Sequence, residues 1–431
     1  MNIICNEEIF NNGNIVLMLN GVSGIVRNLL NSKGIKFKEL NNSSLSFDFY
    51  VPIFKDNKGM VHCDVKYLTN DYLEHMDKLY DKYLYYVGNG VNSREASYIL
   101  PMALKKDLII NCSKEQIVKF VNSLVESNIT ELIELREQLI AVINKYYPSL
   151  NRLIINDRDD STLLEIENTY NNPYTKMFMY DRKRLDRVNL ITESIFGSSL
   201  SSSECNICVY YLMKKYNLTY EVACQNASRL THDNPSIRKK IIDWMIRYEE
   251  DDLLEQINYR FEIPSSLTAL QELSEFGLSN YSVTEMDSWD VSEYYLPESL
   301  SSLGAQKLLL DSIEMMKYLK DGGVRKEDLV YLFTNANIVN LLVNISARDM
   351  IRLCNNGCCE LNGEEVKSIL DQMVKIAKNK TSLLADYYGA TCETIRKCNS
   401  EKRCERSFEH DCIGYLKEKD REKSGYSLKL K

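Results

Sequence analysis

The segment REASYILPMAL, from Arg94 to Leu104, gives the first indication of how this chain is built. Asn92 or Ser93 can cap the first turn of a helix here, because either side chain accepts hydrogen bonds from the free N–H groups of that turn. Pro101 then interrupts the apolar run, and a proline inside a helix kinks or ends it. The sequence therefore predicts a helix that begins at residue 92 or 93 and is broken at the proline.

The same pattern returns 233 residues further along the chain, and the two copies align without a gap. Residues 90–122 align with residues 323–355. Self-similarity of this kind indicates a repeated structural unit. The matched pairs include Gly90 and Gly323, Tyr98 and Tyr331, Asn111 and Asn344, and Asn122 and Asn355.

A second block repeats in the same order at a slightly larger offset. Residues 16–30 align with residues 259–273, and residues 47–52 align with residues 292–297. Each copy thus reads as an alternating strand, a helix, a variable loop, a segment with aromatic residues and proline, and several helices. We predict a tandem duplication with a first copy over 1–155, a linker and helical connection over 156–199, a second copy over 200–395, and a cysteine-containing, charged tail over 396–431.

The composition is typical of a globular protein, with 44% hydrophobic and 26% charged residues in 431. A formal net charge of −8 argues against a nucleic-acid-binding protein that relies on general attraction to phosphates. The longest charge-free stretch, residues 329–347, carries many asparagines that do not belong in lipid, so we predict no membrane span. The start of the chain lacks a signal-peptide pattern, and the 13 cysteines are then expected to be reduced thiols in the cytoplasm.

Histidine and cysteine positions predict no metal site. The four histidines form no HExxH motif or other close pair. Cys205 and Cys208 form a C-x-x-C pair without a second pair, which favours two reduced thiols over a metal or redox site. The denser group near the end of the chain is spaced loosely for structural zinc, and it consists of Cys392, Cys398, Cys404 and Cys412 with His410 nearby.

Several segments resemble the flavin-dependent thymidylate synthases, also called thymidylate synthase complementing proteins. REASYILPMAL is similar to that family's E-[DV]-A-R-x-x-L-P segment. Further similar segments are INYRFEIPSS (257–266), GVRKEDLVYLF (323–333) and the cysteine-containing GATCETIRKCNSEKRC (389–404). The resemblance implies an α/β fold of the α+β kind, with a small antiparallel sheet and long helices in each copy.

The resemblance also implies a reaction and an assembly. FAD would be the cofactor, dUMP and a methylene-folate the substrates, and a reduced flavin would take part in converting dUMP to dTMP. The family works as a homotetramer with sites shared between subunits. A homodimer of this two-copy chain could therefore imitate four subunits.

The cationic residues that face flavin and nucleotide phosphates in the family are replaced here. The R-H-R-x7-S signature falls on Ser32-Lys33-Gly34 in the first copy and on Ser274-Glu275-Phe276 in the second. The arginine of E-x-A-R falls on Ser97 and Val330. In the first copy other residues could bind FAD or a nucleotide, and these candidates are Lys33, Lys36, Lys38, Arg94, Tyr98 and Asn111.

Two hypotheses about function stay open from the sequence, and neither assigns a catalytic residue. In the first, the chain is an enzyme with degenerate sites, which binds FAD and dUMP weakly and performs the family reaction slowly or not at all. In the second, it is a non-catalytic scaffold, or a protein that binds a nucleotide or flavin and kept only the fold. The missing arginines favour the second hypothesis, and the retained ILPMAL segment favours the first.

Overall fold

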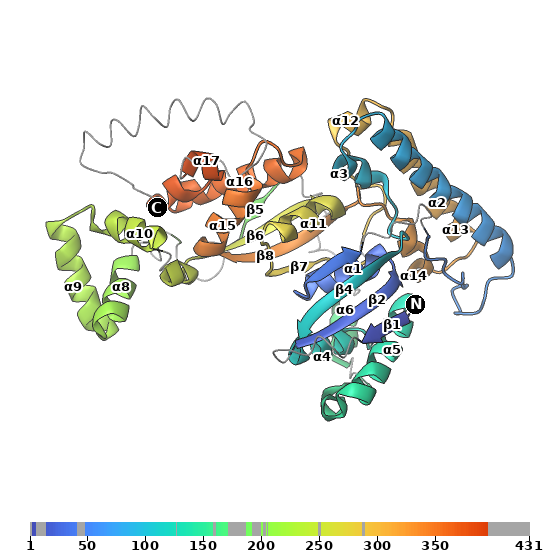
Figure 1. The fold of residues 1–431 in the computed structure, drawn as a ribbon, viewed down its shortest axis with the longest axis horizontal. Helices are drawn as coiled ribbons and strands as arrows, with labels where there is room; N and C mark the ends of the chain where they lie inside the picture. The colour runs from blue at the N-terminus through green and yellow to red at the C-terminus, as the bar shows by residue number, and fades with distance from the viewer. Residues whose placement is uncertain are drawn as a thin grey trace. The chain divides into compact units, whose positions relative to one another are not determined.

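Figure 1 shows the fold of a computed structural model of the chain, which describes residues 2–5, 14–40, 48–125, 127–157, 161–170, 187–191, 200, 204, 206–248, 251–286 and 289–394. The described residues divide into two compact units. The first unit takes its residues from Met1–Leu185, Ser266–Thr268 and Thr284–Ile338, and the second from Asp186–Ser265, Ala269–Val283 and Val339–Lys431. Most of the predicted linker over 156–199, and the whole predicted tail over 396–431, lie outside the described residues.

The first unit contains a four-stranded sheet with the order β1-β2-β4-β3, in which every neighbouring pair is antiparallel. Ile15, Leu17 and Leu19 of β2 are buried, because alternate side chains of a strand point to the same face. The strands are β1 (Asn2–Cys5), β2 (Asn14–Val22), β3 (Phe37–Leu40) and β4 (Lys106–Ser113). The helices are α1 (Gly24–Ser32), α2 (Val65–Gly88), α3 (Ser93–Ala96), α4 (Lys114–Ser123), α5 (Thr130–Tyr146), α6 (Ser161–Tyr170), α12 (Glu298–Ser301), α13 (Gln306–Asp321) and α14 (Lys326–Leu329).

The long helices α2 and α13 lie side by side within this unit (Figure 1). Nε2 of His75 lies 2.9 Å from Oγ of Ser312, and Lys78 forms an ion pair with Asp311. The hydroxyl of Tyr318, near the end of α13, donates to Asp71, near the start of α2. The two helices therefore run antiparallel and are joined by polar contacts along their length.

The segment REASYILPMAL forms less helix than the sequence predicts. The helix starts where expected, because the side chain of Asn92 accepts a hydrogen bond from the N–H of Arg94 at 2.9 Å. One 3₁₀ turn follows at Ser97–Ile99, and Leu100 is then extended, since the residue before a proline disfavours the helical conformation. Pro101 forms an antiparallel β-bridge with Thr334. The break at the proline thus lets the chain pair with a later segment of the same unit.

The second sheet lies mainly in the second unit and has the order β5-β6-β8-β7. Strand β5 is antiparallel to β6, and β7 is antiparallel to β8. The strands are β5 (Asn189–Leu190), β6 (Asn258–Ser266), β7 (Tyr281–Val283) and β8 (Ile338–Ser346). The helices are α8 (Ile207–Tyr216), α9 (Tyr220–Asp233), α10 (Ile237–Arg247), α11 (Leu267–Glu275), α15 (Ala347–Gly357), α16 (Glu364–Lys380) and α17 (Thr391–Thr394).

Strands β4 and β8 differ from the sequence prediction, which placed only helices after each aromatic-proline segment. Both are short apolar runs, and such a run cannot be told from a buried helix by its periodicity. Each strand ends at a serine that caps the following helix: Ser113 accepts from the N–H of Gln116 at 3.2 Å, and Ser346 from that of Asp349 at 3.1 Å. Small antiparallel sheets with many helices confirm the predicted α+β class.

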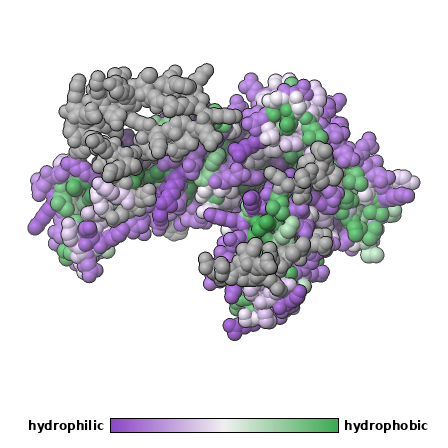
Figure 2. All heavy atoms as spheres, in the orientation of Figure 1, coloured by the Kyte–Doolittle hydropathy of each residue, from purple (hydrophilic) through white to green (hydrophobic). Residues whose placement is uncertain are grey.

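Where residues are coloured in Figure 2, hydrophilic ones prevail on the face shown, and hydrophobic residues form separate patches among them. None of the helices in the described part of the chain combines the length and the apolar character that a membrane span requires.

Candidate functional site

The carboxyl end of α1 forms a turn that carries Lys33 and Lys36 and leads into β3, where Lys38 lies. The N–H of Gly34 donates to the carbonyl of Asn31 at 2.9 Å, and the N–H of Ile35 donates to that of Leu30 at 3.0 Å. This pair of bonds is the Schellman motif, which needs a left-handed residue after the helix. Gly34 supplies it with a φ of +66°, and the buried Ile35 anchors the turn.

The structure brings four of the six predicted residues together at this turn and the adjoining strand pair. The N–H of Asn111 on β4 donates to the carbonyl of Lys36 at 3.3 Å, and Lys38 pairs with Ile109 in the β3–β4 ladder. The side chain of Gln116, in the first turn of α4, donates to the carbonyl of Gly34 at 3.1 Å. The four exposed residues gathered here are Lys33, Lys36, Lys38 and Asn111.

Arg94 and Tyr98 lie on other elements of the first unit. Arg94 is exposed on α3. Tyr98 is 3% exposed and belongs to a core cluster with Ile99, Leu300 and Leu308, and its ring centroid lies 5.8 Å from that of Tyr295. The ring of Tyr98 is therefore used for packing against α12 and α13 in this structure.

The second unit repeats the turn with different side chains. The N–H of Leu278 donates to the carbonyl of Leu273 at 2.9 Å, Gly277 has a φ of +115°, and the N–H of Asn344 donates to the carbonyl of Asn280 at 3.0 Å. When the turns are matched at Gly34 and Gly277, Phe276, Asn280 and Ser282 stand at the positions of Lys33, Lys36 and Lys38. Phe276 thus takes the place that the sequence alignment gave to Glu275. This turn consequently lacks the three ammonium groups of its counterpart.

The first unit also contains a buried carboxylate that sequence reasoning missed. Glu131 on α5 accepts hydrogen bonds from the N–H of Ser23 at 2.8 Å, from its hydroxyl at 2.6 Å, and from the hydroxyl of Tyr331 at 3.2 Å. Burial raises the pKa of Glu131, against the opposing effect of the bonds from Ser23 and Tyr331. No motif points to Glu131 in the sequence, because its partners Ser23 and Tyr331 lie 108 and 200 residues away along the chain.

Tyrosine rings enclose this carboxylate. Tyr331 stacks on Tyr50 with ring centroids 4.7 Å apart, and the hydroxyl of Tyr72 donates to the carbonyl of Tyr50 at 2.9 Å. Burial is the largest cause that raises the pKa of Tyr331 above its usual range, and the charge of Glu131 adds to it. A group this buried has no access for a substrate, so its role is to hold the amino end of α1 against α5 and Tyr331.

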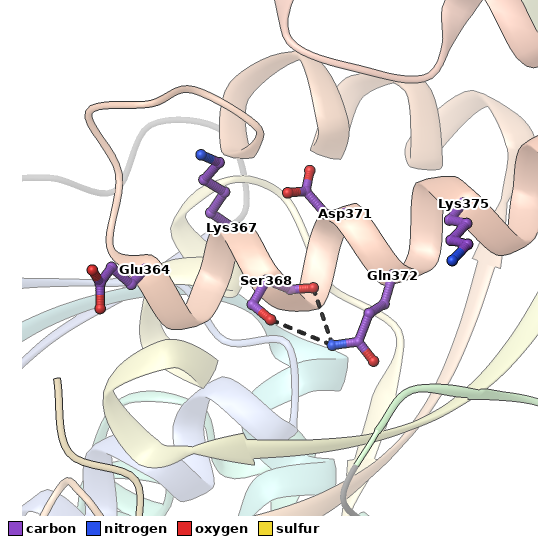
Figure 3. A pocket seen from close by; sticks show the side chains of 6 residues that line it. All are labelled: Glu364, Lys367, Ser368, Asp371, Gln372 and Lys375. Atoms are coloured by element: carbon purple, nitrogen blue, oxygen red, sulfur yellow. Dashed lines mark hydrogen bonds between the residues drawn. The ribbon is translucent and has the colours of Figure 1, made fainter. Parts of the chain in front are cut away.

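A pocket of about 420 Å³ lies along one face of α16 in the second unit (Figure 3). The side chain of Gln372 donates to the carbonyl of Ser368 at 3.2 Å and accepts from the N–H of Val188 at 3.1 Å. Lys367 forms an ion pair with Glu360. The lining residues are Glu364, Lys367, Ser368, Asp371, Gln372 and Lys375. The charges of the two acids and the two lysines cancel, so the pocket offers no net electrostatic attraction to a phosphate.

Eight cysteines are free thiols in the structure, and four of them, Cys112, Cys208, Cys354 and Cys358, are buried. Burial raises the pKa of Cys112 to about 11 and is also the main cause of the raised pKa of Cys208. Cys205, the partner of Cys208 in the C-x-x-C pair, lies outside the described residues, as do Cys398, Cys404, His410 and Cys412.

The side chains of Lys33, Lys36, Lys38 and Asn111 are suited to bind an anion rather than an aromatic ring system. Its three ammonium groups and the Asn111 amide are exposed, so they can bind phosphate oxygens at the surface. The guanidinium of Arg27 on α1 is already paired with Glu39 on β3 at 2.8 Å. None of the side chains of Lys33, Lys36, Lys38 and Asn111 offers an aromatic face to a flavin ring, and we assign no catalytic step to FAD.

Part of the chain is similar to a known protein family. Residues 212–381 match the family model described as thymidylate synthase complementing protein. The match spans less than half of the chain, and it runs from α8 to the end of α16. No curated protein matches the sequence.

Proposed function

We propose that this chain is a flavin-dependent thymidylate synthase-like protein made of two tandem copies, whose sites have lost most of their cations. On this proposal the family reaction, the FAD- and folate-dependent methylation of dUMP to dTMP, is weak or absent. The family match over residues 212–381 supports the second copy. Contacts shared by the two halves of the chain support the existence of the first copy, and substitutions at the expected phosphate-binding positions support the loss of the family reaction.

Corresponding residues of the two proposed copies make corresponding contacts. The bond from Asn111 to Lys36 has its counterpart in the bond from Asn344 to Asn280. The two Schellman turns at Gly34 and Gly277 match, and so does the strand order of the two sheets. Independent folds would not repeat register, turn and capping in the same order along the chain, so these features favour a duplication.

Within the first unit, equivalent residues of the two copies also contact each other. Pro101 pairs with Thr334, which lies 233 residues later, the offset of the repeat. The flanking bonds are reciprocal: the N–H of Met102 donates to the carbonyl of Phe333 at 2.7 Å, and that of Asn335 to the carbonyl of Leu100 at 3.0 Å. A two-fold interface between identical subunits has this self-complementary form.

The tyrosine contacts follow the same symmetry. The stacked pair Tyr50 and Tyr331 corresponds to the pair Tyr295 and Tyr98, whose centroids lie 5.8 Å apart. These contacts support the idea that one chain imitates two subunits of the family. We therefore propose a homodimer that acts as a pseudo-tetramer, located in the cytoplasm.

Light scattering of the purified chain is expected to give a dimer at micromolar concentration, because two chains would supply the family's four copies. A control variant with a charge-neutral change at an exposed position, such as Ser228→Thr on α9, should leave the mass unchanged. A monomer at every concentration tested would contradict the pseudo-tetramer.

The substitutions at the phosphate positions are the observation that carries the loss of activity. Each charge-assisted hydrogen bond that a phosphate loses weakens binding by roughly 1.5–3 kcal/mol. Several such losses lower affinity by about three or more orders of magnitude. Lys33, Lys36 and Lys38 can restore some charge in the first copy, but a lysine does not reproduce the bidentate fork of an arginine. Phe276, Asn280 and Ser282 restore none in the second copy.

Expression in a thymidine-requiring bacterial strain is expected to give no growth without thymidine, because the sites bind FAD and dUMP too weakly. A functional flavin-dependent thymidylate synthase expressed in parallel serves as the positive control. The flavin content of the purified chain, measured by absorbance, should be well below one flavin per chain. Rescue of growth that is abolished by Lys33→Ala or Arg94→Ala would mean that other cations rebuilt the site. The loss-of-activity part of the proposal would then be wrong.

A further inference from the structure

His62, Cys63 and Asp64 stand directly before α2 and outside every site described above. One possible ligand atom from each residue lies within 4.8 Å of the others, and among the described residues no other His, Cys, Asp and Glu side chains form such a group. The three residues offer nitrogen, sulfur and oxygen donors. This donor set is the one that zinc accepts in proteins.

The ring of His62 is oriented by a distant part of the first unit. Its Nε2 lies 2.8 Å from the carbonyl oxygen of Gly322, at the end of α13. Because a carbonyl only accepts, the neutral ring carries its proton on Nε2 and leaves the lone pair on Nδ1. Metal-binding histidines are commonly fixed in this way, by a bond from the other ring N–H to a backbone carbonyl.

Asp64 occupies the N-cap position of α2 but does not use its side chain as a cap. An N-cap aspartate ordinarily accepts the free N–H groups of the first turn. Here its Oδ2 instead lies 3.5 Å from Sγ of Cys63. The carboxylate is therefore turned toward the thiol and away from the helix that it precedes.

Two of the three separations between donor atoms are close to those of a tetrahedral zinc site. Bond lengths of about 2.0–2.3 Å to zinc place neighbouring ligand atoms about 3.4–3.6 Å apart. The separation of Cys63 Sγ and Asp64 Oδ2 is 3.5 Å, and that of Cys63 Sγ and His62 Nδ1 is 4.0 Å. A shift of roughly half an ångström closes the second distance to the tetrahedral value.

We propose that His62 Nδ1, Cys63 Sγ and Asp64 Oδ2 bind a zinc-type divalent cation, with water as the fourth ligand. On binding, the thiol releases its proton to solvent and binds as the thiolate. Without metal, the N–H of Asp64 donates a hydrogen bond to His62 Nδ1 at 3.1 Å. When the metal takes Nδ1, this N–H donates to water instead, because Asp64 is exposed. Since His62 also holds Gly322, the metal strengthens the link between the start of α2 and the end of α13.

The test uses the full chain, reduced and stripped of metal, with Co²⁺ as a spectroscopic probe and Zn²⁺ as its competitor. Wild type is expected to bind one equivalent of Co²⁺ with a thiolate-to-cobalt charge-transfer band, and Zn²⁺ should displace it. Cys63→Ser should remove the band and weaken Zn²⁺ binding by about tenfold or more, and Asp64→Asn should weaken it less. Cys392→Ser, which changes a cysteine of the carboxyl-terminal group, is the matched control and should keep the band.

Two results would overturn the proposal. One is a band that persists in Cys63→Ser or disappears in Cys392→Ser, because other cysteines would then hold the metal. The other is the absence of any stoichiometric Co²⁺ or Zn²⁺ binding by wild type. Cys63 and Asp64 are exposed, so the metal-free variants should unfold at the wild-type temperature, and this measurement separates lost binding from lost folding.

Discussion

Replacing Glu131 by alanine is expected to lower the free energy of unfolding of the first unit by about 3 kcal/mol or more. The carboxylate is 0% exposed and accepts from the N–H and hydroxyl of Ser23 and from the hydroxyl of Tyr331. Without it, three buried donors lose their acceptor at once, and each unsatisfied donor costs about 1–3 kcal/mol. Denaturant unfolding followed by tyrosine fluorescence and circular dichroism measures the loss.

Two further variants make the Glu131 experiment specific. Glu134→Ala changes an exposed glutamate one turn later on α5 and should alter stability by no more than about 0.5 kcal/mol. Glu131→Gln keeps an acceptor oxygen of the same shape and should cost less than Glu131→Ala. If Glu131→Ala is as stable as Glu134→Ala, the carboxylate does not hold α1, α5 and Tyr331 together.

The sequence predicted those parts of the fold that depend on local chemistry. Asn92 caps α3 as expected, because a cap needs only a suitable side chain two residues before a free N–H group. The repeat placed Asn111 and Asn344 at matching positions, and the structure has them on β4 and β8, each bonded to the turn after a helix. Local pattern was less informative for β4 and β8 themselves, since a short apolar run suits a strand or a buried helix.

The candidate site was predictable only where its residues are close in sequence. Lys33, Lys36 and Lys38 follow one helix end, and the structure gathers them beside Asn111. Tyr98 was predicted for the same site, and the structure packs its ring against Tyr295, in the segment whose Pro101 pairs with Thr334. That pairing joins segments 233 residues apart, and no periodicity in the sequence reveals which side chains it buries.

Lowering the pH is expected to decrease the free energy of unfolding, because His75 is buried between α2 and α13. Burial is the main cause that lowers the pKa of His75 to about 4; the charge of Lys78 adds to this shift, and Asp311 opposes it. Nε2 of His75 contacts Oγ of Ser312, whose hydroxyl already donates to the carbonyl of Leu308 at 3.1 Å. The hydroxyl oxygen of Ser312 therefore accepts a hydrogen bond from the neutral ring of His75. The ring's hydrogen-bond partner is uncharged, so it does not neutralise the positive charge of a protonated ring.

The sign of the pH effect follows from where the proton binds. An unfolded histidine takes up a proton near pH 6.5, whereas the folded one does so only near pH 4, so the unfolded state binds more protons between these values. Stability contributed by the neutral ring is complete above pH 6.5 and falls as the pH drops toward 4. The full loss is about 3 kcal/mol, at about 1.4 kcal/mol for each pH unit.

Unfolding free energies of wild type and His75→Leu, measured from pH 7.5 to 4.5, test this prediction. Leucine suits the site because Leu308 stands at the matching position of the repeat. Wild type should lose about 2–3 kcal/mol more than His75→Leu over that range. His232→Leu, at a histidine whose side chain is 89% exposed, should follow the wild-type curve. Parallel curves for wild type and His75→Leu would mean that His75 takes up its proton equally in the folded and unfolded states, and that burial between α2 and α13 does not keep it neutral.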